Sequence, residues 1–137
     1  MTQPLWTKLN LTTQSVVHVL DAPASFEPEL AALGEVTVQR AVRGRVTFAL
    51  AFVVTQQALD ARSAALVRAA EGDAILWMIY PKGTSKRYRA EFNRDSSWQV
   101  LRDAGFETVR MVAIDADWSA LRFRRVEFSA PSRRARS

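Results

Sequence analysis

The side chains with the greatest chemical potential lie in residues 74–86, where an apolar run ends abruptly at a cationic loop. Lys82 and Lys86 supply two ammonium groups, and Thr84 and Ser85 supply two hydroxyls between them. Such a loop at the end of a buried strand is how open α/β sheets present a binding edge, and its charge favours an anion. An alternative of equal weight is that both lysines are solvated loop side chains.

Five further candidate binding residues stand where other strands are expected to end or begin. Asp21 follows an apolar run, and it is also a residue type that caps helices and pins turns. Thr55 precedes a helical stretch, and the first N–H groups of a helix attract anions. Asp115 and Asp117 are typical turn residues that would also suit general acid–base chemistry. Trp118, at the edge of the same loop, would stack on a ligand or pack in the core.

The common catalytic and cofactor signatures are missing from the sequence. It contains no glycine-rich phosphate loop and no G-x-S-x-G nucleophile elbow. His18 is the only histidine, so it cannot build a multi-histidine metal site, and its place among valines predicts a core position. No cysteine is present to supply a thiolate ligand. The sequence predicts no metal and no cofactor, and it favours a binding protein over an enzyme.

Composition predicts one globular domain with a charged tail. The chain has 137 residues, 48% of them hydrophobic, and a formal net charge of +5. Residues 1–130 are expected to form a single domain, and residues 131–137 a flexible basic tail. The absence of cysteine, of a signal peptide and of an apolar run of about 18 residues predicts a cytoplasmic protein without membrane contact. Nucleic-acid binding is a minor alternative, carried by six arginines: Arg122, Arg124, Arg125, Arg133, Arg134 and Arg136.

Strands and helices are expected to alternate through the middle of the chain. Residues 4–11 form a short helix or an irregular lead-in. Ser25 and Thr55 are expected to cap helices that end at Gly34 and at Glu71-Gly72, and Asp95 or Ser96 to cap the last helix. The expected strands are 15–20, 35–40, 45–54, 74–80, 108–114 and 120–128, and the expected helices are 25–33, 56–70 and 97–104.

Two of these strands, 45–54 and 74–80, are apolar on both faces, which predicts a central parallel sheet covered by helices. The short connection at 115–118 predicts a terminal antiparallel hairpin. The fold class is therefore α/β: a three-layer Rossmann-like sandwich with a mixed, mostly parallel sheet and an antiparallel C-terminal strand. In such a sheet the ends of four strands, with all the candidate residues above, would share one edge.

Two segments resemble a bacterial family of domains of unknown function. They are Leu76-Trp-Met-Ile-Tyr-Pro-Lys82, with a W-x-x-Y-P-K pattern, and Val112-Ala-Ile-Asp-Ala-Asp-Trp-Ser-Ala-Leu-Arg-Phe123, with an A-I-D-x-x-W-S-x-L-R-F pattern. The segments Asn93-Arg-Asp95, Pro4-Leu-Trp-Thr-Lys-Leu9 and Val19-Leu-Asp-Ala-Pro23 extend the likeness over nearly the whole chain. The resemblance implies no particular activity.

The order of elements also resembles the C-terminal half of class I methyltransferases, a Rossmann-like fold. This resemblance implies an S-adenosylmethionine site made by a glycine-rich loop after the first strand and an acidic residue ending the second. Here the corresponding segments are Asp21-Ala-Pro-Ala-Ser25 and Gln39-Arg40. The chain is also shorter than the full seven-stranded fold requires. It is expected to be a reduced relative that has lost the cofactor site.

Three functions follow, in order of preference. The first is a non-catalytic module that binds an anionic small molecule or a protein partner at residues 82–86. The alternative is a divergent S-adenosylmethionine-dependent methyltransferase-like enzyme. The third is weak nucleic-acid binding through the arginine tail.

Overall fold

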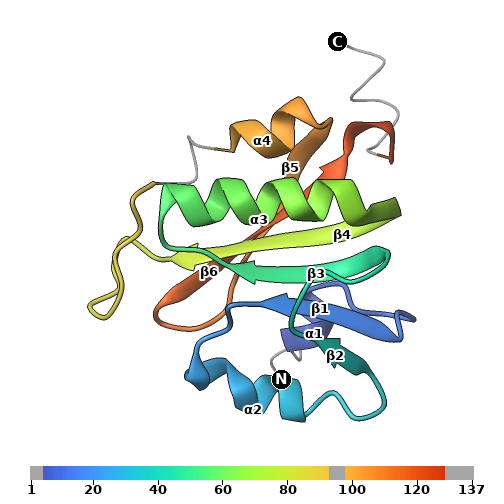
Figure 1. The fold of residues 1–137 in the computed structure, drawn as a ribbon. Helices are drawn as coiled ribbons and strands as arrows, with labels where there is room; N and C mark the ends of the chain where they lie inside the picture. Colours follow the sequence, from blue (N-terminus) through green and yellow to red (C-terminus); the bar gives the residue numbers. More distant parts are fainter. Residues whose placement is uncertain (1–4, 93–97, 129–137) are drawn as a thin grey trace.

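The computed structural model describes residues 5–92 and 98–128, which form one six-stranded sheet flanked by helices (Figure 1). The caps predicted at Asp95 and Ser96 and the basic tail predicted at residues 131–137 lie outside the described residues. In chain order the elements are α1 (Leu5–Lys8), β1 (Val16–Leu20), η1 (Ala24–Phe26), α2 (Glu27–Ala31), β2 (Thr37–Gln39), β3 (Val46–Phe52), α3 (Gln56–Ala69), β4 (Ala70–Pro81), α4 (Gln99–Asp103), β5 (Phe106–Ala113), β6 (Trp118–Arg125) and η2 (Val126–Phe128).

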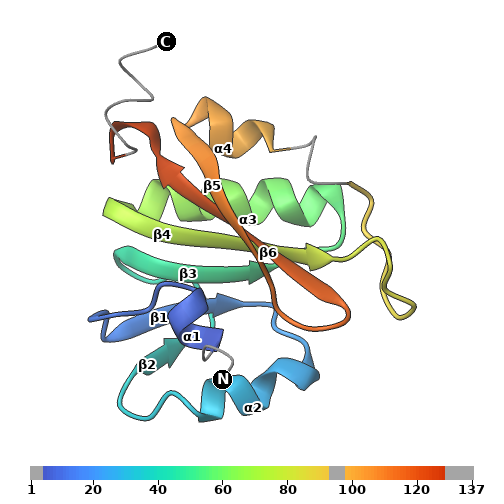
Figure 2. The same cartoon turned by 180° about the vertical axis from the view of Figure 1, so that it is seen from behind.

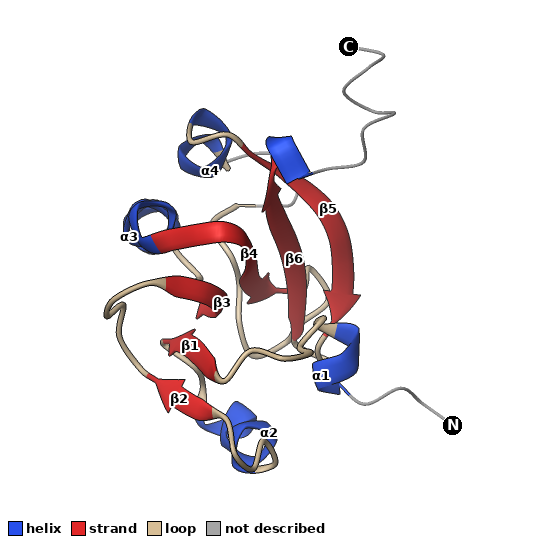
Figure 3. Cartoon of the chain, turned by 90° about the vertical axis from the view of Figure 1, so that its right-hand side faces the viewer, coloured by secondary structure: helices blue, strands red, loops and turns tan. Residues whose placement is uncertain are grey.

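The sheet confirms the predicted fold class. Its strand order is β2-β1-β3-β4-β6-β5, and β2, β1, β3 and β4 run parallel. β6 lies antiparallel between β4 and β5, with Leu76 opposite Phe123 and Pro81 opposite Trp118. Seen along the sheet in Figure 3, α3 and α4 lie on one side and α1 on the other. The molecule is a three-layer Rossmann-like α/β sandwich.

Each face of the sheet has its own apolar core, because residues of the central strands alternate between the two faces. Under α3 and α4, the core is built around Leu66, Met78 and Trp98. On the opposite face, visible in Figure 2, α1 and α2 cover a second core built around Phe48 and Trp77. β3 and β4 contribute to both cores, which explains their continuous apolar sequence.

Two predicted helix ends differ from the structure. Ser25 is not a cap: it lies inside the short helix η1, and Phe26 is the N-cap of α2. Gly34 does follow the second helix with φ +69°, a conformation that favours glycine. Thr55 caps α3 as predicted, since its side chain accepts a hydrogen bond from the N–H of Ala58.

The third helix ends within one residue of its predicted last residue, Ala70, but the break predicted at Glu71-Gly72 before the next strand is wrong. α3 ends at Ala69 and β4 begins at the next residue, so no separate loop connects them. Gly72 adopts φ +58° inside β4, within the stretch where the register between β3 and β4 shifts. A glycine at positive φ within a strand is a bulge signal rather than a helix terminator here.

No helix in the described part of the chain is long and apolar enough to span a membrane.

Candidate functional site

The carboxyl ends of β1, β3, β4 and β5 meet at one edge of the sheet, on the left in Figure 1. This is the carboxyl edge, and it carries all nine candidate residues predicted from the sequence. Two connections meet directly there, because the N–H of Lys82, after β4, donates to the carbonyl of Asp117, before β6, at 2.8 Å.

Asp21 is held in an ion pair at the end of β1. Its carboxylate accepts two hydrogen bonds from the guanidinium of Arg62, at 2.7 and 3.0 Å. Arg62 is on α3, so the pair bridges the end of β1 to the helix that follows β3. Asp21 also has φ +61°, a conformation that Asp tolerates better than most residues. The structure therefore gives Asp21 a partner from within the chain.

A carboxylate from the chain also lies at the N-terminus of α3. The N–H of Gln56 donates to Glu91 Oε1 at 2.9 Å, and the N–H of Glu91 donates to the carbonyl of Val54 at 3.0 Å. Thr55 is engaged as the cap of the same helix. The anion-attracting end of this helix thus binds Glu91, a residue that the sequence did not single out.

The two aspartates of the β5–β6 connection have structural partners. Asp115 Oδ1 accepts from the N–H groups of Asp117 and Trp118, at 2.8 and 3.0 Å, which is a turn held by its own side chain. Asp117 Oδ1 accepts from the Ser85 hydroxyl at 2.9 Å. Ser85 Oγ in turn accepts from the N–H groups of Arg87 and Tyr88. Ser85 and Asp117 therefore fix the loop after β4 against this turn.

Trp118 is buried, with 4% of its surface exposed. Its ring packs edge-on against Phe52, with centroids 5.2 Å apart, and against Tyr88 at 4.8 Å. The indole N–H has no hydrogen-bond partner among the described residues. In this structure Trp118 is a core aromatic covered by Tyr88.

A pocket of about 240 Å³ opens at the end of β4. We call it the edge pocket, and define it by nine residues: Tyr80, Pro81, Lys82, Gly83, Ser85, Tyr88, Arg89, Ala90 and Phe92. Three of these are aromatic, two are cationic and none is acidic. Neither cation forms an ion pair with any described residue.

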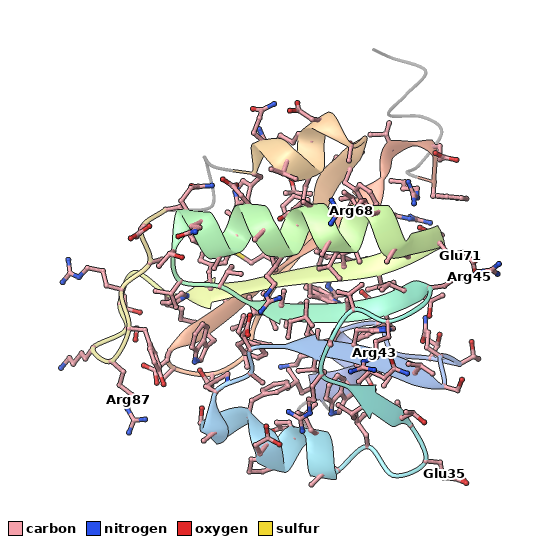
Figure 4. The ribbon with its side chains drawn as sticks, in the orientation of Figure 1. Glu35, Arg43, Arg45, Arg68, Glu71 and Arg87 are labelled. Carbon is pink, nitrogen blue, oxygen red and sulfur yellow. The ribbon has the colours of Figure 1, made fainter. Side chains whose placement is uncertain are left out.

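Of the four binding residues predicted in the loop after β4, two line the edge pocket and two do not. Lys82 and Ser85 line it, whereas Thr84 and Lys86 belong to the same loop but do not. Figure 4 shows that Arg87 extends outward from the tip of this loop. Tyr88, Arg89 and Phe92 were not among the residues predicted from the sequence, although the tyrosine within the basic run Lys86-Arg-Tyr-Arg89 was a visible signal.

The three arginines of β6 proposed for nucleic-acid contact are all engaged within the fold. Arg124 forms a bidentate pair with Asp73, which raises the pKa of Arg124. Arg125 donates to the carbonyls of Gly72 and Ala70. Arg122 donates to Asn10, and burial lowers its pKa. No group of three or more potential metal ligands occurs in residues 5–92 and 98–128.

Arg40, just after β2, binds the carboxylate of Glu27 on α2 through two hydrogen bonds of 2.8 and 2.9 Å. The hydrogen bond lowers the pKa of Glu27 and raises that of Arg40. Because the folded-state pKa of Glu27 is depressed, the pair stabilises the protein above the ordinary glutamate pKa. The stabilisation is lost as the pH falls through the lowered value.

Arg40→Gln should therefore weaken the fall in melting temperature between about pH 5 and pH 3. The effect is expected to be small because both side chains are about half exposed. Melting curves at closely spaced pH values measure it. Arg43→Gln, a change to an exposed arginine in the same β2–β3 connection, is the matched control and should leave the pH profile unchanged. Equal profiles for Arg40→Gln and the parent chain would contradict the assignment.

Several solved structures that resemble this chain in fold are methyltransferases. Magnesium protoporphyrin IX methyltransferase from Synechocystis PCC 6803 matches with a TM-score of 0.55 and 16% identity, over 88% of this chain and 78% of that one. A SAM-dependent methyltransferase from Aquifex aeolicus matches with 0.55 and 14%, over 89% and 88%. A Burkholderia thailandensis 1,6-didemethyltoxoflavin-N1-methyltransferase matches with 0.52 and 15%, over 88% and 74%.

No protein-family model and no curated protein sequence matches the chain. The family resemblance drawn from the W-x-x-Y-P-K segment stays a prediction. At these low identities the structural likeness concerns the fold alone, and that fold is the Rossmann-like fold of S-adenosylmethionine-dependent methyltransferases.

Proposed function

We propose that the chain is a divergent relative of S-adenosylmethionine-dependent methyltransferases that binds a small molecule at the carboxyl edge of its sheet. The fold carries this proposal, since nearly nine tenths of the chain superposes on enzymes of that class. Two functions are compatible with it: methyl transfer, and ligand binding without catalysis. The comparisons favour methyl transfer over the non-catalytic module that the sequence favoured.

The loop after β1 is where the resemblance implies the cofactor. In this chain that loop is Asp21-Ala-Pro-Ala-Ser25, which has no glycine, and Pro23 has no N–H to donate. The Asp21 carboxylate binds Arg62, and Arg40 stands at the end of β2 where an acidic residue is implied. These residues do not fit S-adenosylmethionine in the way the resemblance implies. We therefore assign no methyl-transfer step to individual residues.

The second function, binding without catalysis, is supported by the edge pocket. Its described lining residues include two cations and no acid, and neither Lys82 nor Arg89 forms an ion pair with a described residue. A concave site with aromatic walls and a few polar groups is typical of small-molecule binding. Its charge favours a ligand that carries a negative group.

Isothermal titration of the full chain with S-adenosylmethionine and S-adenosylhomocysteine tests the first function, methyl transfer. Methyl transfer requires S-adenosylmethionine to bind, so the absence of heat from both compounds at high protein concentration would remove that function. A thermal-shift series with nucleotides and phosphorylated metabolites tests the second function, because ligands of the folded state raise the melting temperature. We expect at least one of these compounds to bind. If none does, the proposal as a whole is overturned.

A further inference from the structure

We propose that the edge pocket binds a small aromatic anion: one planar ring that carries one carboxylate or phosphate group. This inference deepens the second of the two proposed functions and rests on it. The ligand class follows from the walls, the charge and the size of the pocket, which the last residues of β4 and the loop after it provide.

The aromatic walls of the edge pocket are fixed before any ligand arrives. Tyr80 and Phe92 are 7% and 9% exposed, and their ring centroids lie 6.0 Å apart. Trp98 packs against both rings, at 5.6 Å from Tyr80 and 5.5 Å from Phe92. Tyr88, another lining residue, packs with the core of the other sheet face, where its ring lies 4.8 Å from that of Trp118. Rigid aromatic walls favour a planar partner, because ring–ring contacts add to the burial of apolar surface.

The backbone of the pocket loop is also held in place. Lys82 and Ser85 are tied to Asp117 by the hydrogen bonds described above, and the Ser85 hydroxyl accepts from two following N–H groups. At the far end of the loop, Glu91 is bonded to Val54 and to the start of α3. A site held at both ends loses little conformational entropy when a ligand binds.

The charge and the size of the pocket then limit the ligand. Lys82 is a half-buried lining residue, and Arg89 is an exposed lining residue whose planar guanidinium suits a carboxylate or phosphate. Among the hydrogen bonds between described residues, the carboxylate of Asp117 accepts from the lining residue Ser85. The volume of about 240 Å³ lies below the range of roughly 300–1,000 Å³ that is typical for drug-sized ligands. A single ring with one anionic group matches both limits.

Nuclear magnetic resonance titration of the ¹⁵N-labelled full chain tests whether the edge pocket binds small aromatic anions, and it detects dissociation constants in the millimolar range. Benzoate and phenyl phosphate should shift the amide signals of residues 82–92 saturably. Benzyl alcohol lacks the charge, and acetate and inorganic phosphate lack the ring, so each should bind at least about fivefold more weakly. Lys82→Gln and Arg89→Gln should each raise the dissociation constant for benzoate about fivefold.

Two variants of the same loop provide matched controls. Lys86→Gln and Arg87→Gln remove cations that do not line the pocket, so the dissociation constant should change less than about twofold. If all four variants raised the dissociation constant for benzoate equally, the edge pocket would not be the binding site. The anion would then be attracted only by the general positive charge of the loop.

Two further titrations, with adenosine monophosphate and with S-adenosylmethionine, distinguish a failure of the aromatic-anion proposal from a failure of the proposed function. If either compound shifts the carboxyl-edge signals while benzoate and phenyl phosphate do not, the aromatic-anion assignment alone is wrong. If no compound shifts these signals, both the assignment and the binding function that underlies it are overturned.

Discussion

Trp77→Phe is expected to lower the free energy of unfolding by about 2–3 kcal/mol. Trp77 is fully buried at the centre of β4, and its indole N–H donates to the carbonyl of Leu9 at 2.8 Å. Phenylalanine leaves that carbonyl without its partner and leaves space unfilled in the core beneath α1. The bond joins residues 68 positions apart, so its loss should also loosen the N-terminal segment. Urea denaturation measures the change as a shift in midpoint at constant slope.

Trp118→Phe is the matched control for this prediction. Trp118 is likewise a buried tryptophan on a central strand, but its N–H has no partner among the described residues. Removing an unsatisfied buried donor offsets part of the volume lost with the indole, so the cost should stay below about 1 kcal/mol. Equal losses in the two variants would show that the hydrogen bond to Leu9 contributes nothing measurable.

Local patterns in the sequence were sufficient to predict a mixed, mostly parallel sheet, but they did not give its strand order. The long apolar runs of β3 and β4 require burial on both faces, which leaves a helix-covered parallel arrangement as the natural solution. The short connection before Trp118 likewise left an antiparallel hairpin as the simplest pairing. The direct passage from α3 into β4 was not predictable, because Glu71-Gly72 is as typical of a helix end as of a bulge.

The sequence was sufficient to predict where in the fold the candidate residues lie, but not which residues they contact. Strand direction alone brought the candidate residues to the carboxyl edge. The partners of Asp21 and of the α3 N-terminus are Arg62 and Glu91, which lie 41 and 35 positions away in the sequence. Sequence patterns that relate residues a few positions apart cannot predict contacts over such separations. For the same reason the composition of the loop suggested that Lys82 and Lys86 were equivalent, whereas only Lys82 lines the pocket.

Glu91→Ala is expected to lower the free energy of unfolding by about 1 kcal/mol, and to loosen the pocket loop. The substitution removes the carboxylate that accepts from the N–H of Gln56, where the partial positive charge of α3 stabilises an anion. It also removes one of the two bonds that hold the end of the loop carrying Ala90 and Phe92, while the backbone bond to Val54 remains. Chemical denaturation measures the stability change. Amide hydrogen exchange should become faster through residues 82–92.

Glu91→Gln and Thr55→Ala separate the charge of this contact from its geometry. Glutamine keeps an acceptor oxygen but no charge, so it should recover part of the loss caused by alanine. Thr55→Ala removes an uncharged cap of the same helix, at a cost of about 1 kcal/mol. Raising the salt concentration from 0.1 to 1 M shortens the screening length from about 10 to 3 Å. The effect of Glu91→Ala should therefore shrink with salt while that of Thr55→Ala persists; equal salt dependence would show that charge is not what holds the loop to α3.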